Sequence, residues 1–387
     1  MNIFNSLGSN YNLKFVLSSL FANGSDKDRQ DLIHLLEKKY NGKAILLYKG
    51  REALTLAIKT LNLPPKTEAA INGFTCFAVY KAIEKAGYKP VCLDLDSDKF
   101  DLNFSTSVLE AEVKKNPNLK VVIVQNTLGY PCDIEGILEI CKKKNLVLIE
   151  DLAHCVGTKY SNGKEAGTVG PIAVLSFSQD KVIDAVSGGA LIIRERTLAS
   201  QGEALQSKKI NFRQQLKDKF YPILTYKIRT FYSFGLGKLL HFLLKKLDLL
   251  SKPMEENLYE LLSLPNWYCY LAMIGFNNLS QNLNHRRRIA QIYIDNLNKS
   301  AQSKEIAQNL DLSSNLRFPI FVEKRAQLLE YLKDYGIHVS DIWYEDVSPD
   351  CPNAQKVSRK VLNLPTHINV SERDARLICE RINELIQ

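Results

Sequence analysis

The stretch Leu146-Val147-Leu148-Ile149-Glu150-Asp151-Leu152-Ala153-His154 decides the fold of this 387-residue chain. Its first four residues form an unbroken apolar run, which is typical of a strand buried on both faces of a parallel sheet. Asp151 directly follows the expected strand 146–150. A carboxylate in this place is partly removed from water, which is unfavourable unless a cation or hydrogen-bond donors meet it. The stretch therefore predicts a buried strand followed by an acid that needs a specific partner.

Six further apolar runs are bounded by turn residues, at 44–48, 68–71, 90–94, 121–125, 172–176 and 190–194. Stretches with a helical period lie between many of them, such as 51–61, 77–86 and 134–144. Strands that alternate with helices indicate crossover connections and a parallel sheet. We therefore expect an α/β fold with a seven-stranded, mainly parallel sheet, in a large domain over residues 41–206.

The rest of the chain divides into three parts. Residues 1–40 form an N-terminal helical segment, with a helix expected over 26–40, and residues 207–255 form a basic, amphipathic helical insert. From residue 256 onward the strand–helix alternation stops, and a mixture of helices and short strands follows. Residues 256–387 are therefore predicted to form a smaller α+β domain, and the chain length agrees with one large and one small unit.

Composition argues against several classes of protein. The eight cysteines are scattered, with no C-x-x-C pair and no His/Cys cluster at zinc-finger spacing, so we expect reduced thiols and no metal site. Residues 1–10 lack the pattern of a signal peptide, and the apolar run 13–21 is short for a membrane span. A cytoplasmic protein is therefore expected.

The net charge of +9 is local rather than spread along the chain. Residues 208–252 contain eleven Lys and Arg against two Asp, which equals the whole excess, so the remainder is neutral. Because one patch produces the charge, it does not indicate a nucleic-acid partner.

The same region is amphipathic. One helical stripe carries Leu236, Leu239, Leu240, Leu243, Leu244, Leu247 and Leu250. Upstream, aromatic residues alternate with basic ones, and such an element can make peripheral contact with an anionic membrane through 217–250. The alternative is that the stripe packs on this protein or on a dimer partner. We favour this alternative, because amphipathic helices mostly cover cores.

Lys181 indicates the chemistry of the site. It ends the run Ser176-Phe177-Ser178-Gln179-Asp180-Lys181, one strand and one loop after Asp151. A lysine amine can form a Schiff base with an aldehyde, and an aspartate can keep a pyridine nitrogen protonated so that the ring withdraws electrons. Each residue alone has an ordinary explanation, as a surface charge or a helix cap. The pair predicts a pyridoxal 5'-phosphate site with Lys181 and Asp151 as catalytic residues, although Asp180 favours the charged amine.

Four residues are expected at the phosphate end of this site. Gly50 lies between a strand and a helix, where main-chain N–H groups and the helix dipole attract a phosphate, and Arg51 can add a cation. Ser176 and Ser178 project to one side of an extended segment and can bind phosphate or orient the lysine. The alternatives are a simple turn, a solvated arginine and hydroxyls bonded to nearby main chain.

Three residues are expected at the ring of the cofactor. His154 can hydrogen-bond the phenolic oxygen, although a lone histidine is as often structural. Phe74 and Phe77 follow the strand 68–71, where an aromatic ring can stack on a flat cofactor. Core packing is the alternative for these phenylalanines, and we favour it for at least one of them.

Two motifs together resemble those of the DegT/DnrJ/StrS family of sugar aminotransferases, which are fold-type I pyridoxal phosphate enzymes. Residues 150–157 are similar to its Glu-Asp-x-Ala-Gln/His-x-x-Gly segment, and Ser176-Phe177-x-x-x-Lys181 with Gly188-Gly189 is similar to its lysine loop. The similarity runs from about residue 43 to 194 and from about 266 to the end. Looser matches lie at 82–94 and 351–365.

The resemblance implies a cofactor linked to Lys181, with Asp151 at the pyridine nitrogen and His154 near the phenolic oxygen. It implies a phosphate held by Gly50, Arg51 and Ser176. Lys181 would also move the proton between substrate and cofactor carbons. A related dehydratase branch carries histidine at the lysine position, so Lys181 favours amino transfer, from glutamate to a keto-sugar nucleotide. The family also implies a homodimer.

Three positions differ from the family pattern. Its Gly-Thr phosphate turn reads Gly50-Arg51-Glu52 here, and Cys76 stands where the family often has an aromatic stacking residue. Cys76 therefore joins Phe74 and Phe77 as a cofactor-binding candidate. The Asn-Tyr-Arg segment by which a partner subunit reaches the phosphate is not recognisable near Asn266. Two alternatives stay open: another fold-type I enzyme, such as a lyase, and a non-catalytic regulator or membrane-surface scaffold of the same fold.

Overall fold

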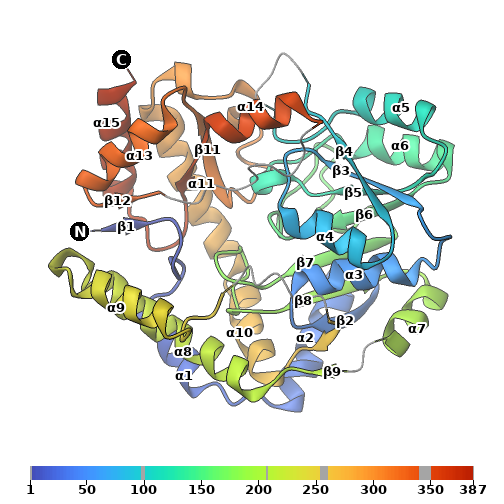
Figure 1. Ribbon diagram of the computed structural model, residues 1–387, viewed down its shortest axis with the longest axis horizontal. Helices are drawn as coiled ribbons and strands as arrows, with labels where there is room; N and C mark the ends of the chain where they lie inside the picture. Colours follow the sequence, from blue (N-terminus) through green and yellow to red (C-terminus); the bar gives the residue numbers. More distant parts are fainter. Residues whose placement is uncertain (1, 97–100, 206–207, 253–259, 340–349, 387) are drawn as a thin grey trace.

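The computed structural model describes residues 2–96, 101–205, 208–252, 260–339 and 350–386. Figure 1 shows a sheet with helices on both sides, a smaller body beside it, and two consecutive helices, α8 and α9, along one edge. The strands are β1 (Ile3–Phe4), β2 (Lys43–Leu47), β3 (Glu68–Asn72), β4 (Lys89–Leu93), β5 (Leu119–Val124), β6 (Val147–Asp151), β7 (Ile172–Ser176), β8 (Gly189–Ile193), β9 (Lys208–Lys209), β10 (Leu262–Ser263), β11 (Arg317–Phe321), β12 (Ile337–His338) and β13 (Val361–Pro365).

The α-helices are α1 (Leu13–Phe21), α2 (Asp26–Tyr40), α3 (Gly50–Thr60), α4 (Phe77–Lys85), α5 (Thr106–Lys115), α6 (Ile134–Lys144), α7 (Arg196–Leu205), α8 (Phe212–Thr230), α9 (Leu236–Lys246), α10 (Asn266–Asn277), α11 (Leu279–Asn296), α12 (Lys304–Gln308), α13 (Arg325–Asp334), α14 (Pro352–Lys360) and α15 (Glu372–Leu385). Short 3-10 helices are η1 (Thr127–Gly129), η2 (Tyr232–Phe234) and η3 (Lys299–Ala301).

Within the described residues the main sheet has nine strands, in the order β4-β3-β5-β6-β7-β8-β2-β10-β9. The run from β4 to β7 is parallel, and β8 runs antiparallel to both β7 and β2. The expected mainly parallel α/β sheet is confirmed, and β2–β8 occupy the seven expected places. The expected number of strands is too low, because β9 and β10 add two-residue strands at one edge. A strand of two residues is too short to show a periodic apolar pattern in the sequence.

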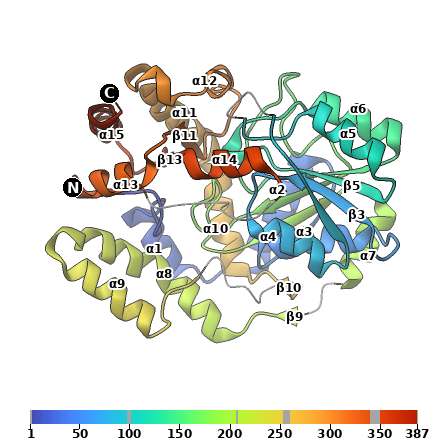
Figure 2. The same ribbon diagram turned by 45° about the horizontal axis from the view of Figure 1, so that its top comes forward.

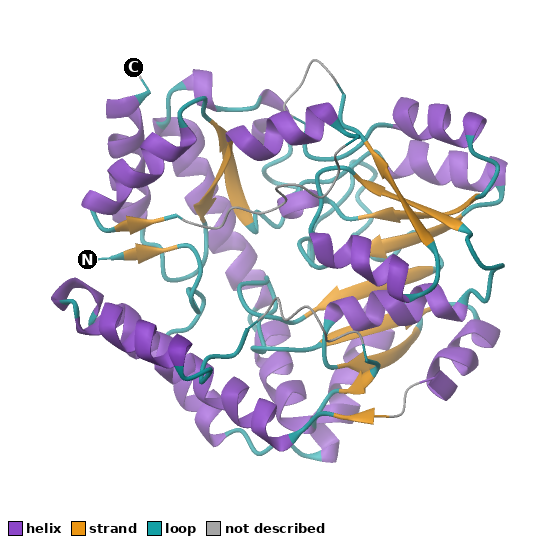
Figure 3. Cartoon of the chain, in the orientation of Figure 1, coloured by secondary structure: helices purple, strands orange, loops and turns teal. Residues whose placement is uncertain are grey.

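Side chains of the sheet alternate between two apolar layers. In β2, Ile45 and Leu47 pack with α3 and α4 in one core, whereas Ala44 and Leu46 pack with α2, α6 and α10 in another. Figure 3 shows these purple helices on the two sides of the orange sheet. Both faces of the central strands are therefore dry, which explains their unbroken apolar runs.

The helix α2 begins and ends where the sequence predicts. The Ser25 hydroxyl accepts a hydrogen bond from the Asp28 main-chain N–H, and the Asp28 carboxylate accepts one from the Ser25 N–H, which forms a capping box. Asn41 ends the helix in the left-handed region at φ 50°, a conformation that asparagine tolerates better than most residues.

A separate apolar core lies between the antiparallel pair β11–β13 and the helices α11, α13, α14 and α15. The N-terminal strand β1 also belongs here, because it pairs in parallel with β12 through Ile3 and Ile337. The smaller body thus draws on both ends of the chain. The division at residues 207 and 255–256 falls outside the described residues and stays a prediction.

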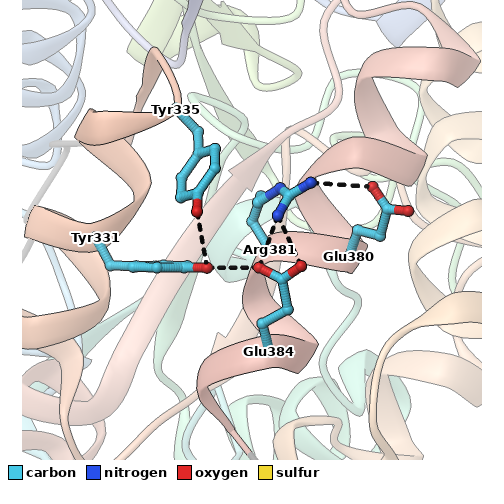
Figure 4. A network of polar contacts seen from close by, with 5 residues as sticks. All are labelled: Tyr331, Tyr335, Glu380, Arg381 and Glu384. Atoms are coloured by element: carbon cyan, nitrogen blue, oxygen red, sulfur yellow. Dashed lines mark hydrogen bonds and ion pairs between the residues drawn. The ribbon is translucent and has the colours of Figure 1, made fainter.

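A polar network joins α13 to α15 on the surface of this body (Figure 4). The Tyr331 hydroxyl donates to the Glu384 carboxylate and lies 3.4 Å from the Tyr335 hydroxyl. Arg381 donates to Glu384 at 2.7 Å and lies 3.7 Å from Glu380. Because this network lies at the surface and its acids are exposed, it orients the two helices but stabilises them little.

The residues expected to form a helical insert fold into α8 and α9, with α1 lying along α8 (Figures 1 and 2). Asp218 anchors α8 to the rest of the chain. Its buried carboxylate accepts hydrogen bonds from Tyr48 at 2.6 Å, Tyr268 at 2.7 Å and Gln214 at 2.9 Å, so the charge is satisfied. Among the described helices, none is both long and apolar enough to cross a membrane.

Candidate active site

The carboxyl edge of the sheet brings together three residues that are far apart in the sequence. Asp151 ends β6, Ser176 ends the neighbouring strand β7, and Gly50 begins α3 directly after β2. Ligands of open α/β sheets bind outside the carboxyl ends of the strands. This edge is therefore where the candidate site was expected and where its residues lie.

Glu150 and Asp151 have different roles although they are adjacent. Glu150 is fully buried and accepts hydrogen bonds from three main-chain N–H groups between 167 and 170, at 2.7–2.8 Å, and from the Tyr160 hydroxyl at 2.9 Å. These donors satisfy both of its oxygens, so it is a structural carboxylate. Successive side chains of a strand point to opposite faces, which turns Asp151 away from this network.

Asp151 is held in place by two donors. Its Oδ1 accepts from the Ala153 main-chain N–H at 3.0 Å, and its Oδ2 lies 3.4 Å from Gln125 Nε2. Gln125 is oriented in turn by the Thr75 hydroxyl, which donates to its Oε1. Burial raises the pKa of Asp151, whereas these hydrogen bonds and the nearby Lys181 lower it. Sequence reasoning missed Gln125 and Thr75, although Gln125 directly follows β5 at the same sheet edge.

Lys181 follows β7 and is half-buried. Burial lowers the pKa of its amine, and the nearby Cys76 and Asp151 act in the opposite direction. Arg317 also lowers it. The net effect favours the neutral amine, which is the nucleophilic and proton-accepting form. The structure therefore brings Lys181 and Asp151 into one electrostatic environment, as the sequence predicts.

The loop that carries Lys181 is built around Asp184. The Asp184 carboxylate accepts hydrogen bonds from the main-chain N–H groups of Asp180 at 2.8 Å and Val186 at 2.9 Å. Asp180 has φ 63°, and its own carboxylate accepts from the Ser9 hydroxyl at 3.1 Å. Asp180 raises the pKa of the Lys181 amine less than Cys76 and Asp151 do. Burial also raises the pKa of Asp180 itself. Asp180 therefore leaves the direction of the Lys181 shift unchanged.

Gly50 makes the start of α3 unusually close to the sheet. A Cβ on Gly50 would stand 2.7 Å from Ser176 Cβ, and a Cβ on Gly189 would stand 2.7 Å from Gly50 Cα. No side chain caps this helix, because its N-cap residue is Lys49. Main-chain N–H groups of an uncapped helix start attract anions. Gly50 and Ser176 therefore meet at a point suited to a phosphate, with Arg51 in the first turn of the helix.

His154 is buried, and burial lowers its pKa, so the ring is neutral. Its Nδ1 accepts a hydrogen bond from the Leu128 main-chain N–H at 3.2 Å. In a neutral ring that accepts at Nδ1, the hydrogen is carried by Nε2. The imidazole is therefore set to donate from Nε2, as a hydrogen bond to a phenolic oxygen requires.

The three candidates for a ring contact lie in different environments. Phe74 is fully buried in the core of the smaller body. Phe77 is 46% exposed and stacks on Tyr80, with ring centroids 5.9 Å apart. Cys76 lies between them in the sequence, at the N-cap of α4. After burial, it has the largest effect on the pKa of Lys181. Ser178 is half-buried, and its carbonyl accepts from the Lys181 N–H at 3.4 Å. These four contacts with a cofactor stay predictions.

Sequence reasoning also missed two buried arginines. Arg286 and Arg317 are fully buried, and both donate to the Leu316 carbonyl at 3.0 Å. Arg317 acts electrostatically on Lys181 and His154, lowering the pKa of each. The Arg286-Arg287-Arg288 run is visible in the sequence, but no local pattern distinguishes its fully buried member from the other two.

These residues fit a pyridoxal phosphate group. A buried acid lies near a lysine whose pKa is lowered by burial, and an uncapped helix start lies beside Ser176 where a Cβ would fill the space. Across the described part of the chain, no group of three or more His, Cys, Asp or Glu could hold a metal ion. The fold and site together define the class of pyridoxal phosphate-dependent transferases.

Comparison with known proteins names the family. The model of the DegT/DnrJ/EryC1/StrS aminotransferase family matches residues 30–238 and 259–383, so the chain belongs to this family of pyridoxal phosphate-dependent aminotransferases. GDP-perosamine synthase of Escherichia coli O157:H7 is 25% identical over 361 residues, covering 90% of this chain and 87% of that protein.

Solved structures of the family share the fold. DesI, in the presence of its TDP-sugar product, has a TM-score of 0.73 at 17% identity and covers 99% of this chain and 92% of that chain. A sugar aminotransferase of Streptococcus pneumoniae, Spr1654 in its PLP form, has a TM-score of 0.70 at 17% identity, with 99% and 98% covered. At these identities the likeness confirms the fold.

Proposed function

We propose that this chain transfers the amino group of an amino acid, glutamate, to a keto-sugar nucleotide. The observation that carries the proposal is that buried Asp151 and half-buried Lys181 lie at the carboxyl edge of the sheet, where each acts on the pKa of the other. The names of a relative, GDP-perosamine synthase, and of a structural neighbour with a TDP-sugar product support the nucleotide-sugar acceptor. The transfer would be carried out by a homodimer, as the family resemblance implies, and in the cytoplasm, as the scattered cysteines suggest.

Each residue would have a defined task. When bound, pyridoxal phosphate supplies the carbonyl that exchanges the amino group and a ring that withdraws electrons. Gly50, Arg51 and Ser176 would hold its phosphate, and Asp151 would hold the proton on its ring nitrogen. Gln125 and the Ala153 N–H keep the Asp151 carboxylate oriented for this task.

Lys181 and His154 would act on protons. Because burial favours the neutral Lys181 amine, the amine can take a proton from the substrate carbon and return it. Neutral His154 can donate a hydrogen bond from Nε2 to the phenolic oxygen, since its Nδ1 is already occupied by the Leu128 N–H. The core encloses His154 and excludes water from it, whereas Lys181 is half-buried.

A lysine replacement tests the proposal. Purified protein should absorb in the visible range, and borohydride should reduce the cofactor onto the peptide that contains residue 181. Lys181→Ala should lose this adduct and all turnover, while the control Lys164→Ala, an exposed lysine, should keep both. A saturated protein without an adduct at residue 181 would refute the assignment of Lys181.

Substrate tests separate the alternatives. Glutamate alone should convert the bound aldehyde to the amine form, and mass spectrometry with a panel of keto-sugar nucleotides should then show gain of an amino group on one of them. Release of an elimination product from an amino acid, without amino transfer, would instead indicate a lyase. Light scattering of the purified protein tests the homodimer, because a monomer with full activity contradicts it.

A further inference from the structure

Exposed apolar side chains are concentrated in α1, α8 and α9, which pack on one another. In the described residues, fourteen of the nineteen exposed large hydrophobic residues belong to α1 or to residues 212–249. Together these form what we call the apolar face: Leu13, Leu17, Phe21, Phe212, Leu216, Phe220, Phe231, Phe234, Leu236, Leu239, Phe242, Leu243, Leu247 and Leu249. Phe234 is 77% exposed and Phe21 is 76% exposed, so these are rings in water rather than edges of a core.

The exposed apolar residues recur at helical spacing, so they lie along one side of each helix. In α8, Asp218, Tyr221 and Thr225 point into the protein, while Phe212, Leu216 and Phe220 recur at a spacing of four residues on the opposite side. In α9, only part of the leucine stripe packs on this chain. Leu244 is buried, whereas Leu236, Leu239, Leu243 and Leu247 are exposed.

The charge of the chain lies in the same place. Residues 208–252 contain all of the net charge of +9. Arg213, Lys227, Lys238, Lys245 and Lys246 are exposed and form no ion pair with a carboxylate among the described residues. Aromatic and leucine side chains that alternate with unpaired cations match the boundary between acyl chains and anionic headgroups.

We propose that the apolar face docks on an anionic lipid bilayer, with α8 and α9 lying in the plane of the membrane surface. The eleven-residue helix α9 is about 16 Å long, which is too short to span the hydrocarbon core. A second copy of this chain is the less favourable occupant. A twofold interface places the same patch against itself, so the positive segments of both copies would face each other.

Vesicle co-sedimentation of the full chain tests the proposal. The protein should pellet with vesicles of phosphatidylcholine and phosphatidylglycerol, but not with phosphatidylcholine alone, and added sodium chloride should release it. Lys245→Gln with Lys246→Gln should lower the partition coefficient about 25-fold, because each basic residue contributes about fivefold. Leu239→Ser with Phe242→Ser should abolish pelleting.

A matched control keeps the test specific. Lys114→Gln with Lys144→Gln removes two exposed lysines from α5 and α6, on another part of the surface, and should leave pelleting unchanged. All variants should keep the visible absorbance of the cofactor, which shows that they fold. Equal pelleting with both kinds of vesicle, no pelleting at all, or unchanged pelleting of the two double variants in α9 would overturn the proposal. So would a fall in oligomer mass in Leu239→Ser with Phe242→Ser, because the face would then join copies of the chain.

Discussion

Asn10 and Lys181 are joined by a hydrogen bond across 171 positions of sequence, from Asn10 Nδ2 to the Lys181 carbonyl oxygen at 3.1 Å. The same amide nitrogen lies 3.0 Å from Asp184 Oδ2, and the Tyr11 hydroxyl donates to Asp184 Oδ1 at 3.0 Å. The N-terminal segment therefore holds the lysine loop from outside. It also holds the smaller body, because β1 pairs with β12.

Removing the Asn10 side chain should loosen the lysine loop. We expect Asn10→Ala to lower the free energy of unfolding by about 1–3 kcal/mol, since Asp184 loses a donor in a buried place. The cofactor should also leave faster when free pyridoxal phosphate is removed by dialysis. Urea unfolding and the decay of visible absorbance measure the two effects. Asn118→Ala, at an exposed position, is the control, and equal behaviour of the two variants would contradict this prediction.

Adding one methyl group at Gly50 should disturb the phosphate end of the site. The new Cβ in Gly50→Ala would stand 2.7 Å from Ser176 Cβ, so the apoprotein should lose about 1–3 kcal/mol of stability through overpacking. The double variant Gly50→Ala with Ser176→Gly removes the clash and should recover most of this loss. Thermal unfolding of the apoproteins checks both statements. A stable single variant would show that α3 can move away from β7.

Replacing Gln125 should raise the pKa of Asp151. Gln125→Leu removes a hydrogen bond that lowers the pKa of Asp151, so this pKa should rise further. A higher pKa keeps the carboxyl protonated to a higher pH, and the acidic limb of the pH–rate profile should move upward. We expect kcat/KM near neutral pH to fall about tenfold. Thr75→Val leaves Gln125 in place but unoriented and should show a smaller shift. Identical profiles for all three proteins would exclude this role.

Asp184 should make stability depend on pH. Burial, with Asp180 as the next cause, raises its pKa to about 7 in the folded chain, well above the value of an unfolded aspartate. The folded state then binds a proton that the unfolded state has released, so the free energy of unfolding should fall as pH rises from about 4 to about 7. Asp184→Asn should flatten this part of the curve. Urea unfolding at several pH values measures it, with Asp311→Asn, at an exposed position, as the control. A curve that keeps its slope in Asp184→Asn would assign the effect to another group.

Local patterns predicted much of this structure. The helix expected over 26–40 is present, and its ends coincide with the capping box of Ser25 and the left-handed Asn41. The strands β2–β8 follow from apolar runs, because a strand buried on both faces needs apolar residues at every position. The two-residue strands β9 and β10 have no such pattern, and their pairing depends on where distant segments end.

The candidate site was predicted in outline for the same reason. Asp151, Ser176 and Gly50 could be placed at one edge because parallel strands share a direction. Gln125 and Arg317 were missed. Each acts through a neighbour far away in the sequence, and one glutamine or arginine has no spacing that distinguishes it from surface residues.

The sequence by itself determined the parallel sheet, the acid at the end of β6 and the lysine after β7. Buried strands and the helices that connect them produce apolar patterns of recognisable period in the sequence. Only the tertiary structure decided that Phe74 is buried in the core of the smaller body while Phe77 is exposed, and that Asn10 holds the lysine loop. It also decided that most of the leucine stripe of α9 faces outward. Such contacts depend on how whole layers pack, and packing joins residues whose separation along the chain carries no signal.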